Sequence, residues 1–163
     1  NVHNGGLVGL NSSGYVLSSY AQGNLTSTSY VSRRRQGSGP LNNVYINIGG
    51  LIGTNQSSVS NSFATGSITS SITVHNDAVN STNAIRYGGL IGQGSSVKSY
   101  RSSLQSFSIT SGPTLTPNNT GASTNDSNLR TSSWVFNLTN LDWDDQIWEV
   151  DGSNYPRLIN NTY

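Results

Sequence analysis

The pentapeptide GGL[VI]G decides the fold of this chain. It occurs three times, as GGLVG at residues 5–9 and as GGLIG at residues 49–53 and 88–92. The similarity extends on both sides, because Val2, Ile46 and Ile85 align upstream and SYAQGNLT at 19–26 matches SFATGSIT at 62–69. The third copy is degenerate, with SYRS at 99–102 and no matching glycine afterwards. Spaced copies with extended similarity indicate an internal duplication.

Each copy predicts short strands separated by turn residues. In VYINI at 44–48, apolar side chains alternate with Tyr45 and Asn47, a period of two that fits a strand and not a helix. A core of about 22 residues cannot bury its apolar face alone, so neighbouring copies must stack. We therefore expect an all-β fold, a right-handed parallel β-helix (β-solenoid) of about three repeats, with cores near 5–26, 49–69 and 88–110.

Stacking predicts columns of equivalent side chains. Leu7, Leu51 and Leu90 are expected to stack along the core, as are Tyr20, Phe63 and Tyr100. Asn11 matches Asn55, which predicts an amide ladder, and Gly94 replaces the Asn in the third copy. The structural repeat positions are Gly5, Gly6, Leu7, Gly9, Gly49, Gly50, Leu51, Gly53, Gly88, Gly89, Leu90 and Gly92.

Glycine-rich stretches also occur in ligand loops, but the partner residues of such loops are missing here. A phosphate-binding loop requires a following GK[ST], which no copy has. No copy is followed by a helix, as a dinucleotide-binding fingerprint would be, and none contains the Asp of a calcium-binding nonapeptide. We expect the glycines to serve the backbone, by permitting positive φ at a corner and close approach of stacked coils.

Composition points the same way. The 163 residues suit one domain, with 29 Ser, 15 Thr and 21 Asn, residues that disfavour helix interiors. Only 9% of residues are charged and the net charge is +1, which predicts neither a nucleic-acid partner nor a charged membrane surface. Cys is absent, which excludes disulfides and zinc thiolate sites. No apolar run approaches the roughly 20 residues of a membrane span, so we expect no membrane insertion.

The repeat resembles the GLUG repeat of large secreted and cell-surface proteins, including adhesin-like proteins and the non-catalytic part of some immunoglobulin-A-cleaving metallopeptidases. The ending WEVDGSNYPRL at 148–158 is similar to the segment that often follows such repeats. The resemblance covers most of residues 1–110 and 134–158. It implies an extracellular β-solenoid, and it implies no single activity.

The segments outside the cores complete the predicted organisation. Residues 32–43 and 70–84 are expected to be irregular loops, and 111–133 a long loop that ends the repeat region at 133. Residues 134–163 form the C-terminal capping segment, which holds Trp134, Trp143 and Trp148. We expect these aromatic residues to seal the open core of the solenoid. The alternative is a platform for a sugar.

Five of the seven acidic residues lie in the capping segment: Asp142, Asp144, Asp145, Glu149 and Asp151. Three interpretations remain open: a solvated turn, a calcium site formed by Asp142, Asp144 and Asp145, or a carboxylate pair for glycoside hydrolysis. His3 and His75 are the only histidines; Asp77 lies near His75, but an exposed loop is the expected position, and neither a catalytic triad nor a zinc site is predicted.

Two further features concern the surface. Arg33, Arg34 and Arg35 are the basic run, either solvated or a patch for a phosphate, a sulfated glycan or an acidic partner. Candidate N-glycosylation acceptors are Asn11, Asn24, Asn55, Asn80, Asn118, Asn125, Asn137 and Asn160, a number that this composition produces by chance.

These observations favour an extracellular or cell-surface module with a structural or adhesive role, without cofactor and not an enzyme. The expected partners are copies of itself, neighbouring surface-protein domains or glycans. The alternatives are a polysaccharide-active β-helix enzyme that uses carboxylates among residues 142–151, or a carbohydrate-binding module. An ice-binding surface ranks last, because the outward Thr pattern is irregular.

Overall fold

The computed structural model describes residues 1–32, 44–75, 83–111, 115–117 and 122–159. Strands dominate these residues, as the sequence predicts. The first repeat contains β1 (Val2–Gly5), β2 (Val8–Asn11), β3 (Tyr15–Leu17), β4 (Tyr20–Ala21) and β5 (Leu25–Ser32). The second contains β6 (Val44–Gly49), β7 (Ile52–Asn55), β8 (Ser58–Ser60), β9 (Phe63–Ala64) and β10 (Ile68–His75).

The remaining elements follow in chain order. The third repeat contains β11 (Asn83–Gly88), β12 (Ile91–Gln93), β13 (Tyr100–Ser102) and β14 (Phe107–Ser111). After it come β15 (Leu115–Pro117), β16 (Ala122–Thr124), α1 (Asp126–Leu129), α2 (Ser132–Val135), β17 (Trp148–Glu149) and β18 (Arg157–Leu158). No helix among the described residues is long and apolar enough to cross a membrane.

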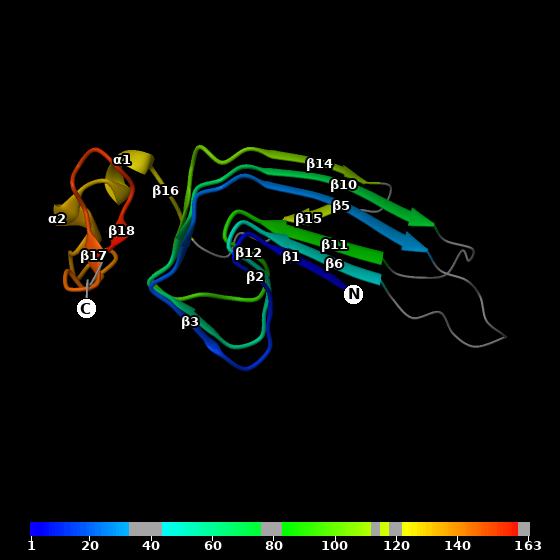
Figure 1. Cartoon of the computed structure of the whole chain (residues 1–163), viewed down its shortest axis with the longest axis horizontal. Helices are drawn as coiled ribbons and strands as arrows, with labels where there is room; N and C mark the ends of the chain where they lie inside the picture. Colours follow the sequence, from blue (N-terminus) through cyan, green and yellow to red (C-terminus); the bar gives the residue numbers. More distant parts are fainter. Residues whose placement is uncertain (33–43, 76–82, 112–114, 118–121, 160–163) are drawn as a thin grey trace.

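Corresponding strands of successive repeats pair in parallel. The sheet orders are β1-β6-β11-β15, β14-β10-β5, β12-β7-β2, β16-β13-β9-β4 and β3-β8, and β17 with β18 forms the antiparallel pair. Figure 1 shows sheets β1-β6-β11-β15 and β14-β10-β5 lying over one another. The register confirms the sequence alignment, because Ile46 lies opposite both Val2 and Ile85. The third repeat keeps the register despite its degenerate sequence, with Tyr100 opposite Phe63.

The pentapeptide marks the bend between sheet β1-β6-β11-β15 and sheet β12-β7-β2, and its glycines serve close backbone approach. A Cβ on Gly49 would lie 1.9 Å from the carbonyl oxygen of Ile52, and one on Gly53 would lie 2.7 Å from the backbone nitrogen of Asn4. The expectation of positive φ at these corners is wrong: among the described glycines, positive φ occurs at Gly94 and Gly152. Only the lack of a side chain matters at the bend.

Two apolar cores lie inside the repeats. Ile46, Ile48 and Ile85 pack against Ile68 and Ile72 between the two long sheets. Below the bend, a second core contains Leu51, Ile52, Leu90 and Ile91. Of the predicted leucine column, Leu51 and Leu90 are fully buried, whereas Leu7, in the repeat at the edge of the sheets, is 54% exposed.

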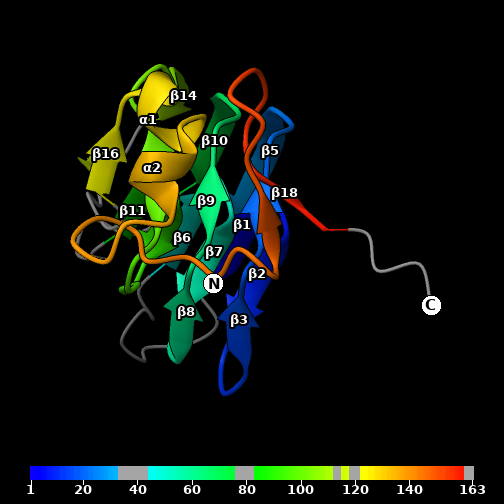
Figure 2. The same ribbon diagram turned by 90° about the vertical axis from the view of Figure 1, so that its left-hand side faces the viewer.

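The third core lies outside the repeats. Phe63 and Ala64 are neighbours on β9, so their side chains point to opposite faces. Ala64 faces the inner core, whereas Phe63 joins Trp143 and Trp148 on the outer face. The predicted Tyr20–Phe63–Tyr100 column is present, because Tyr20 and Tyr100 both lie opposite Phe63 and the rings of Tyr20 and Phe63 stack. The column lies on the outer face, however, and the tryptophans cover it there instead of sealing the end of the stack. Figure 2 shows the C-terminal elements in front of β9, at the side of the repeats.

The predicted loops also need correction. Residues 70–84 include the end of β10, which reaches His75, and the start of β11 at Asn83. Serine fills an inward position here, since Ser70 is buried and its hydroxyl bonds to that of Ser27 at 2.9 Å. Residues 111–133 contain β15, β16, α1 and the start of α2, and buried Leu129 already belongs to the tryptophan core.

Candidate functional site: a polar groove between two sheets

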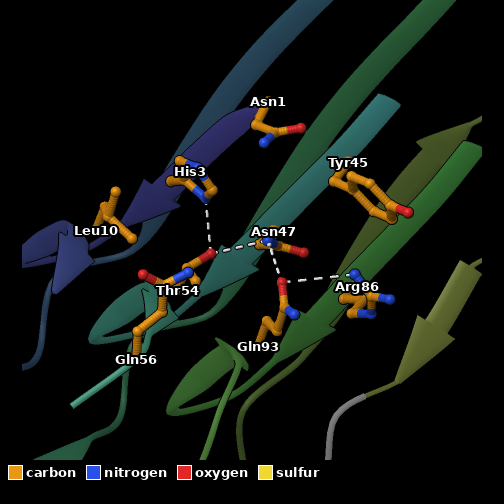
Figure 3. A pocket seen from close by; sticks show the side chains of 9 residues that line it. All are labelled: Asn1, His3, Leu10, Tyr45, Asn47, Thr54, Gln56, Arg86 and Gln93. Carbon is orange, nitrogen blue, oxygen red and sulfur yellow. Dashed lines mark hydrogen bonds between the residues drawn. The ribbon is translucent and has the colours of Figure 1, made fainter. Parts of the chain in front are cut away.

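A groove of about 400 Å³ lies in the inner angle of the glycine bend, between sheet β1-β6-β11-β15 and sheet β12-β7-β2. Its lining comes from all three repeats (Figure 3). The glycines at the bend bring the two sheets close enough for side chains on one to reach side chains on the other. The three copies of the pentapeptide thus position the two sheets that form the groove.

Two rows of side chains line the groove. His3, Asn47 and Arg86 occupy equivalent positions on β1, β6 and β11, two residues before each pentapeptide. Leu10, Thr54 and Gln93 occupy equivalent positions on β2, β7 and β12, one residue after each pentapeptide. The positions repeat but the residue types do not, so each rung of the groove carries a different chemical group.

The rows are joined by hydrogen bonds across the bend (Figure 3). Nδ1 of His3 lies 2.7 Å from Oγ1 of Thr54. Nδ2 of Asn47 donates to Oγ1 of Thr54 and to Oε1 of Gln93, both at 2.8 Å. Nη1 of Arg86 reaches the same Oε1 at 3.5 Å. One network therefore connects five side chains from three repeats.

Asn47 forms the floor of the groove and is only 1% exposed. Both hydrogen bonds of this side chain use Nδ2, and Oδ1 has no hydrogen-bond partner. An unpaired buried acceptor costs roughly 1–3 kcal/mol of folding free energy, so native proteins rarely keep one without a reason. Figure 3 shows this oxygen directed towards Tyr45 and Arg86 at the rim.

The groove carries little charge. Burial lowers the pKa of His3 below its ordinary value of 6.5, which keeps the imidazole neutral at neutral pH. Arg86 therefore supplies the charge among the side chains of the two rows. Its guanidinium carbon lies 5.3 Å from the centre of the Tyr45 ring, within the range of a cation–π contact. The two side chains together form the rim above the amide floor.

The acidic residues of the C-terminal segment do not converge. Among the described residues, no group of three or more His, Cys, Asp or Glu side chains is arranged to hold a metal ion. Asp142 pairs with Lys98 at 2.5 Å, whereas Asp144 accepts the backbone N–H of Gln146 at 2.8 Å. Asp145 accepts a hydrogen bond from the Gln146 side chain at 3.0 Å. The carboxylates of the calcium candidate are thus engaged locally, Asp142 by Lys98 and both Asp144 and Asp145 by Gln146.

Glu149 and Asp151 are likewise engaged in surface contacts. Arg157 binds both oxygens of Glu149 at 2.9 Å, which lowers the pKa of that carboxyl. Asp151 accepts hydrogen bonds from the Asn154 side chain and from the backbone N–H groups of Asn154 and Ser153, which lower its pKa to about 2. Both carboxylates are therefore ionised and solvated, as the turn interpretation predicts.

A second pocket, of about 390 Å³, lies where the C-terminal segment meets the repeats and includes Tyr20, Arg130 and Tyr155. Asp126, which the sequence analysis did not single out, accepts hydrogen bonds from the hydroxyls of Tyr155 and Ser102. Arg130 stacks over the Tyr155 ring at 4.6 Å. Burial, followed by the hydrogen bond to Asp126, raises the pKa of Tyr155. This cluster ties α1 to β13 and to the end of the chain.

The tryptophans are arranged for packing. Trp143 and Trp148 are 3% and 1% exposed, with ring centres 4.7 Å apart, so they offer no open platform to a sugar. Nε1 of Trp143 donates to the carbonyl oxygen of Lys98 at 3.0 Å, which anchors the segment to the third repeat.

The candidate glycosylation acceptors fall in different environments. Asn11 and Asn55 are buried and bonded to one another, whereas Asn24, Asn125 and Asn137 are exposed. The other three acceptors, Asn80, Asn118 and Asn160, lie outside the described residues, as do Arg33, Arg34, Arg35 and Asp77. The backbone of His75 ends strand β10.

Sequence reasoning missed the groove although its signal is present. On sequence alone, His3 is considered only for a catalytic triad or a zinc site, and Asn47 only as an outward strand residue. The useful signal is the fixed offset from the pentapeptide, which places three different polar residues in one row. A comparison of repeats directs attention to constant positions, whereas this groove is lined by the variable ones.

Comparison with known proteins agrees with the repeat pattern. Residues 45–69 match the family model described as the GLUG motif, and they span β6 to the start of β10. No curated protein and no solved structure matches the chain. Within the matched residues, strands β6, β7, β9 and β10 each pair with both the first and the third repeat. The second repeat of this chain therefore carries a GLUG motif.

Proposed function

We propose that this chain is an extracellular module, a right-handed parallel β-helix that has a structural and adhesive role in a surface protein or an extracellular filament. The observation that carries the proposal is the parallel, in-register pairing of equivalent strands through all three repeats. Such stacking makes a stiff body in which each repeat supports its neighbours. The GLUG motif and the polar, weakly charged composition support the same proposal.

The first repeat supports a role in assembly. Strands β1, β2, β3, β4 and β5 all lie at edges of their sheets, so their outward backbone groups are available for pairing. The first repeat also has exposed apolar side chains: Leu7, Tyr15 and Leu17 are 54%, 76% and 54% exposed. We propose a second copy of the chain as the partner, since the same register already joins repeats within one chain.

We further propose that the module is not an enzyme. The carboxylates that could cleave a glycan are engaged in local contacts: Asp142 with Lys98, Asp144 and Asp145 with Gln146, and Glu149 and Asp151 with Arg157. Glycoside hydrolysis instead requires two carboxyl groups that act across one bond. Incubation with a panel of polysaccharides tests this part of the proposal. Cleavage that Asp144→Asn or Asp145→Asn abolishes would overturn it.

The location is tested on intact cells of the source organism with an antibody against this chain. We expect labelling without permeabilisation, and labelling only after permeabilisation would contradict the proposal. Assembly is tested by sedimentation of the purified chain over a range of concentrations. We expect self-association that Leu17→Lys weakens, whereas Leu138→Lys, a change at an exposed leucine in the C-terminal segment, should not.

A further inference from the structure

We propose that the groove in the glycine bend binds a neutral saccharide, whose hydroxyl groups bond to the polar floor that Asn47, Thr54 and Gln93 form. The inference rests on the adhesive part of the proposed function, to which it adds a site and a ligand class. The step from groove to saccharide is carried by three features: the direction of the groove, the unpaired atom at its floor and the low charge of its walls.

The groove runs along the stack of repeats, across the strands. His3, Asn47 and Arg86 lie on three successive strands of one sheet, as do Leu10, Thr54 and Gln93 on the other. Neighbouring strands are about 4.8 Å apart, close to the length of one sugar unit in an extended oligosaccharide. Successive sugar rings can therefore face successive rungs, each with a different polar group.

The floor selects the chemistry of the ligand. Oδ1 of Asn47 is buried and unpaired, while Nδ2 is fully used by Thr54 and Gln93. The missing partner must donate a hydrogen bond, which the ionised oxygens of a sulfate, a carboxylate or a phosphodiester cannot do. A half-turn of the amide would place Nδ2 in the same spot and require an acceptor. A hydroxyl group both donates and accepts, so it satisfies either orientation.

The walls favour a neutral ligand over a charged one. The side chains of Asn47, Thr54 and Gln93 are uncharged, and Arg86 is held by Gln93 at 3.5 Å and by the ring of Tyr45. A second cation to clamp an anion is absent from the described side chains that line the groove. The Tyr45 ring at the rim and the exposed Leu10 can instead pack against the apolar face of a sugar ring.

Binding requires a small movement at the rim. Oδ1 of Asn47 has almost no solvent-accessible surface, and Figure 3 shows it directed towards Tyr45 and Arg86. Both rim side chains are half-buried and project from neighbouring strands. We expect the Tyr45 ring to move outwards when a sugar hydroxyl reaches the floor, a side-chain change of the kind that is common on binding.

Nuclear magnetic resonance titration of the ¹⁵N-labelled chain tests the inference. The probes are neutral oligosaccharides derived from glucan, mannan, galactan and chitin, with sulfated and uronate-containing oligosaccharides as comparison. We expect saturable shifts of the side-chain amide signals of Asn47 and Gln93 with at least one neutral probe. Shifts with charged probes alone, or no shift of these two signals with any neutral probe, would overturn the inference.

Variants separate binding from folding. Gln93→Ala and Tyr45→Ala should each weaken binding by about tenfold, since each removes a contact to the ligand. The matched controls Gln146→Ala and Tyr15→Ala, at exposed positions outside the groove, should bind like the wild type. Thr54→Val keeps the shape of the floor and removes a hydroxyl, so it should also weaken binding, whereas Thr69→Val on the exposed face of β10 should not.

The outcomes distinguish this inference from the proposed function. Variants that keep the β-sheet circular dichroism and the melting temperature, but bind neutral probes as well as the wild type does, would overturn the groove as the binding site. That result would leave the extracellular module intact, because surface labelling and self-association test it independently. Failed labelling, together with saturable binding in the groove, would instead overturn the location and leave the site.

Discussion

Asn11 donates a hydrogen bond from Nδ2 to Oδ1 of Asn55 at 2.8 Å, across 44 residues of sequence. Both side chains are buried, 7% and 6% exposed, at equivalent positions of the first and second repeats. Asn55 in turn donates to the carbonyl oxygens of Ser57 and Ser95, at 2.7 and 2.8 Å. A single amide therefore connects all three repeats at the turn that follows the glycine bend.

Replacing this amide should cost more than replacing an exposed one. Asn55→Ala removes the acceptor at 2.8 Å from Nδ2 of Asn11 and the donor to two turn carbonyls, so we expect a loss of roughly 2–3 kcal/mol in the free energy of unfolding. Asn24→Ala removes one exposed bond, to the backbone N–H of Ser67, and should cost less than about 1 kcal/mol. Urea denaturation measures both changes. Equal losses would contradict the ladder's role in stability.

The glycine bend makes a second prediction. Gly53→Ala places a methyl group 2.7 Å from backbone atoms of both Asn4 and Gly9, which cannot move aside as a side chain can. We expect a loss of about 3 kcal/mol or more, at the upper end of the cost of overpacking. A methyl group on Gly23 meets nothing within 4 Å, so Gly23→Ala should change stability by less than about 1 kcal/mol. The urea concentrations at which the two variants are half unfolded, compared with that of the wild type, test this prediction.

The contact between the repeats and the C-terminal segment can be tested at Phe63. Its ring lies 5.9 Å from that of Trp143 and 5.8 Å from that of Trp148. Phe63→Ala should cost about 3–5 kcal/mol and shift tryptophan fluorescence to longer wavelength, because water reaches the indole rings. The control is Phe107→Ala, since Phe107 packs against Tyr87, away from the tryptophans. Unchanged emission in the Phe63 variant would contradict this packing.

The alignment of repeats predicted those parts of the fold in which equivalent residues touch. The columns Val2–Ile46–Ile85 and Asn11–Asn55 follow directly, because parallel in-register pairing places equivalent residues side by side. The strand β10 was missed beyond Thr69. Its inward positions alternate between Ile and Ser, and only the hydroxyl pair of Ser27 and Ser70 makes a buried serine acceptable there.

The side of the sheet on which Phe63 lies could not be predicted. Phe63 and its neighbour Ala64 are both apolar, so the alternation of apolar and polar residues does not show which of the two faces the core. The deciding factor is space. The interior next to Gly50 is crowded, so the smaller side chain of Ala64 points inwards and Phe63 points outwards. The groove could not be predicted for a related reason. No single residue such as Asn47 or Gln93 indicates a site, because the site forms only when the bend brings the two rows of variable side chains together.

The anchoring of Tyr155 makes the stability depend on alkaline pH. The Tyr155 hydroxyl donates to Asp126, and burial raises the pKa of Tyr155 above its ordinary value of 10. Above pH 10 the unfolded chain has lost this proton while the folded chain retains it, so stability decreases as pH rises from 10 through the raised pKa. The contribution is fully present below pH 10.

Tyr155→Phe separates this effect from the titration of the other tyrosines. At neutral pH the variant should be less stable by about 1 kcal/mol, a value reduced for the partial exposure of the pair. The difference between wild type and variant should shrink above pH 10, because deprotonation removes the same hydrogen bond from the wild type. Tyr15→Phe, at a position 76% exposed, should show no such change. Urea titrations of the three proteins at pH 7, 9 and about 11 measure the differences. If the difference in the free energy of unfolding between wild type and Tyr155→Phe stayed constant across this range, the pKa of Tyr155 would be the same in the folded and the unfolded chain, which would contradict the prediction.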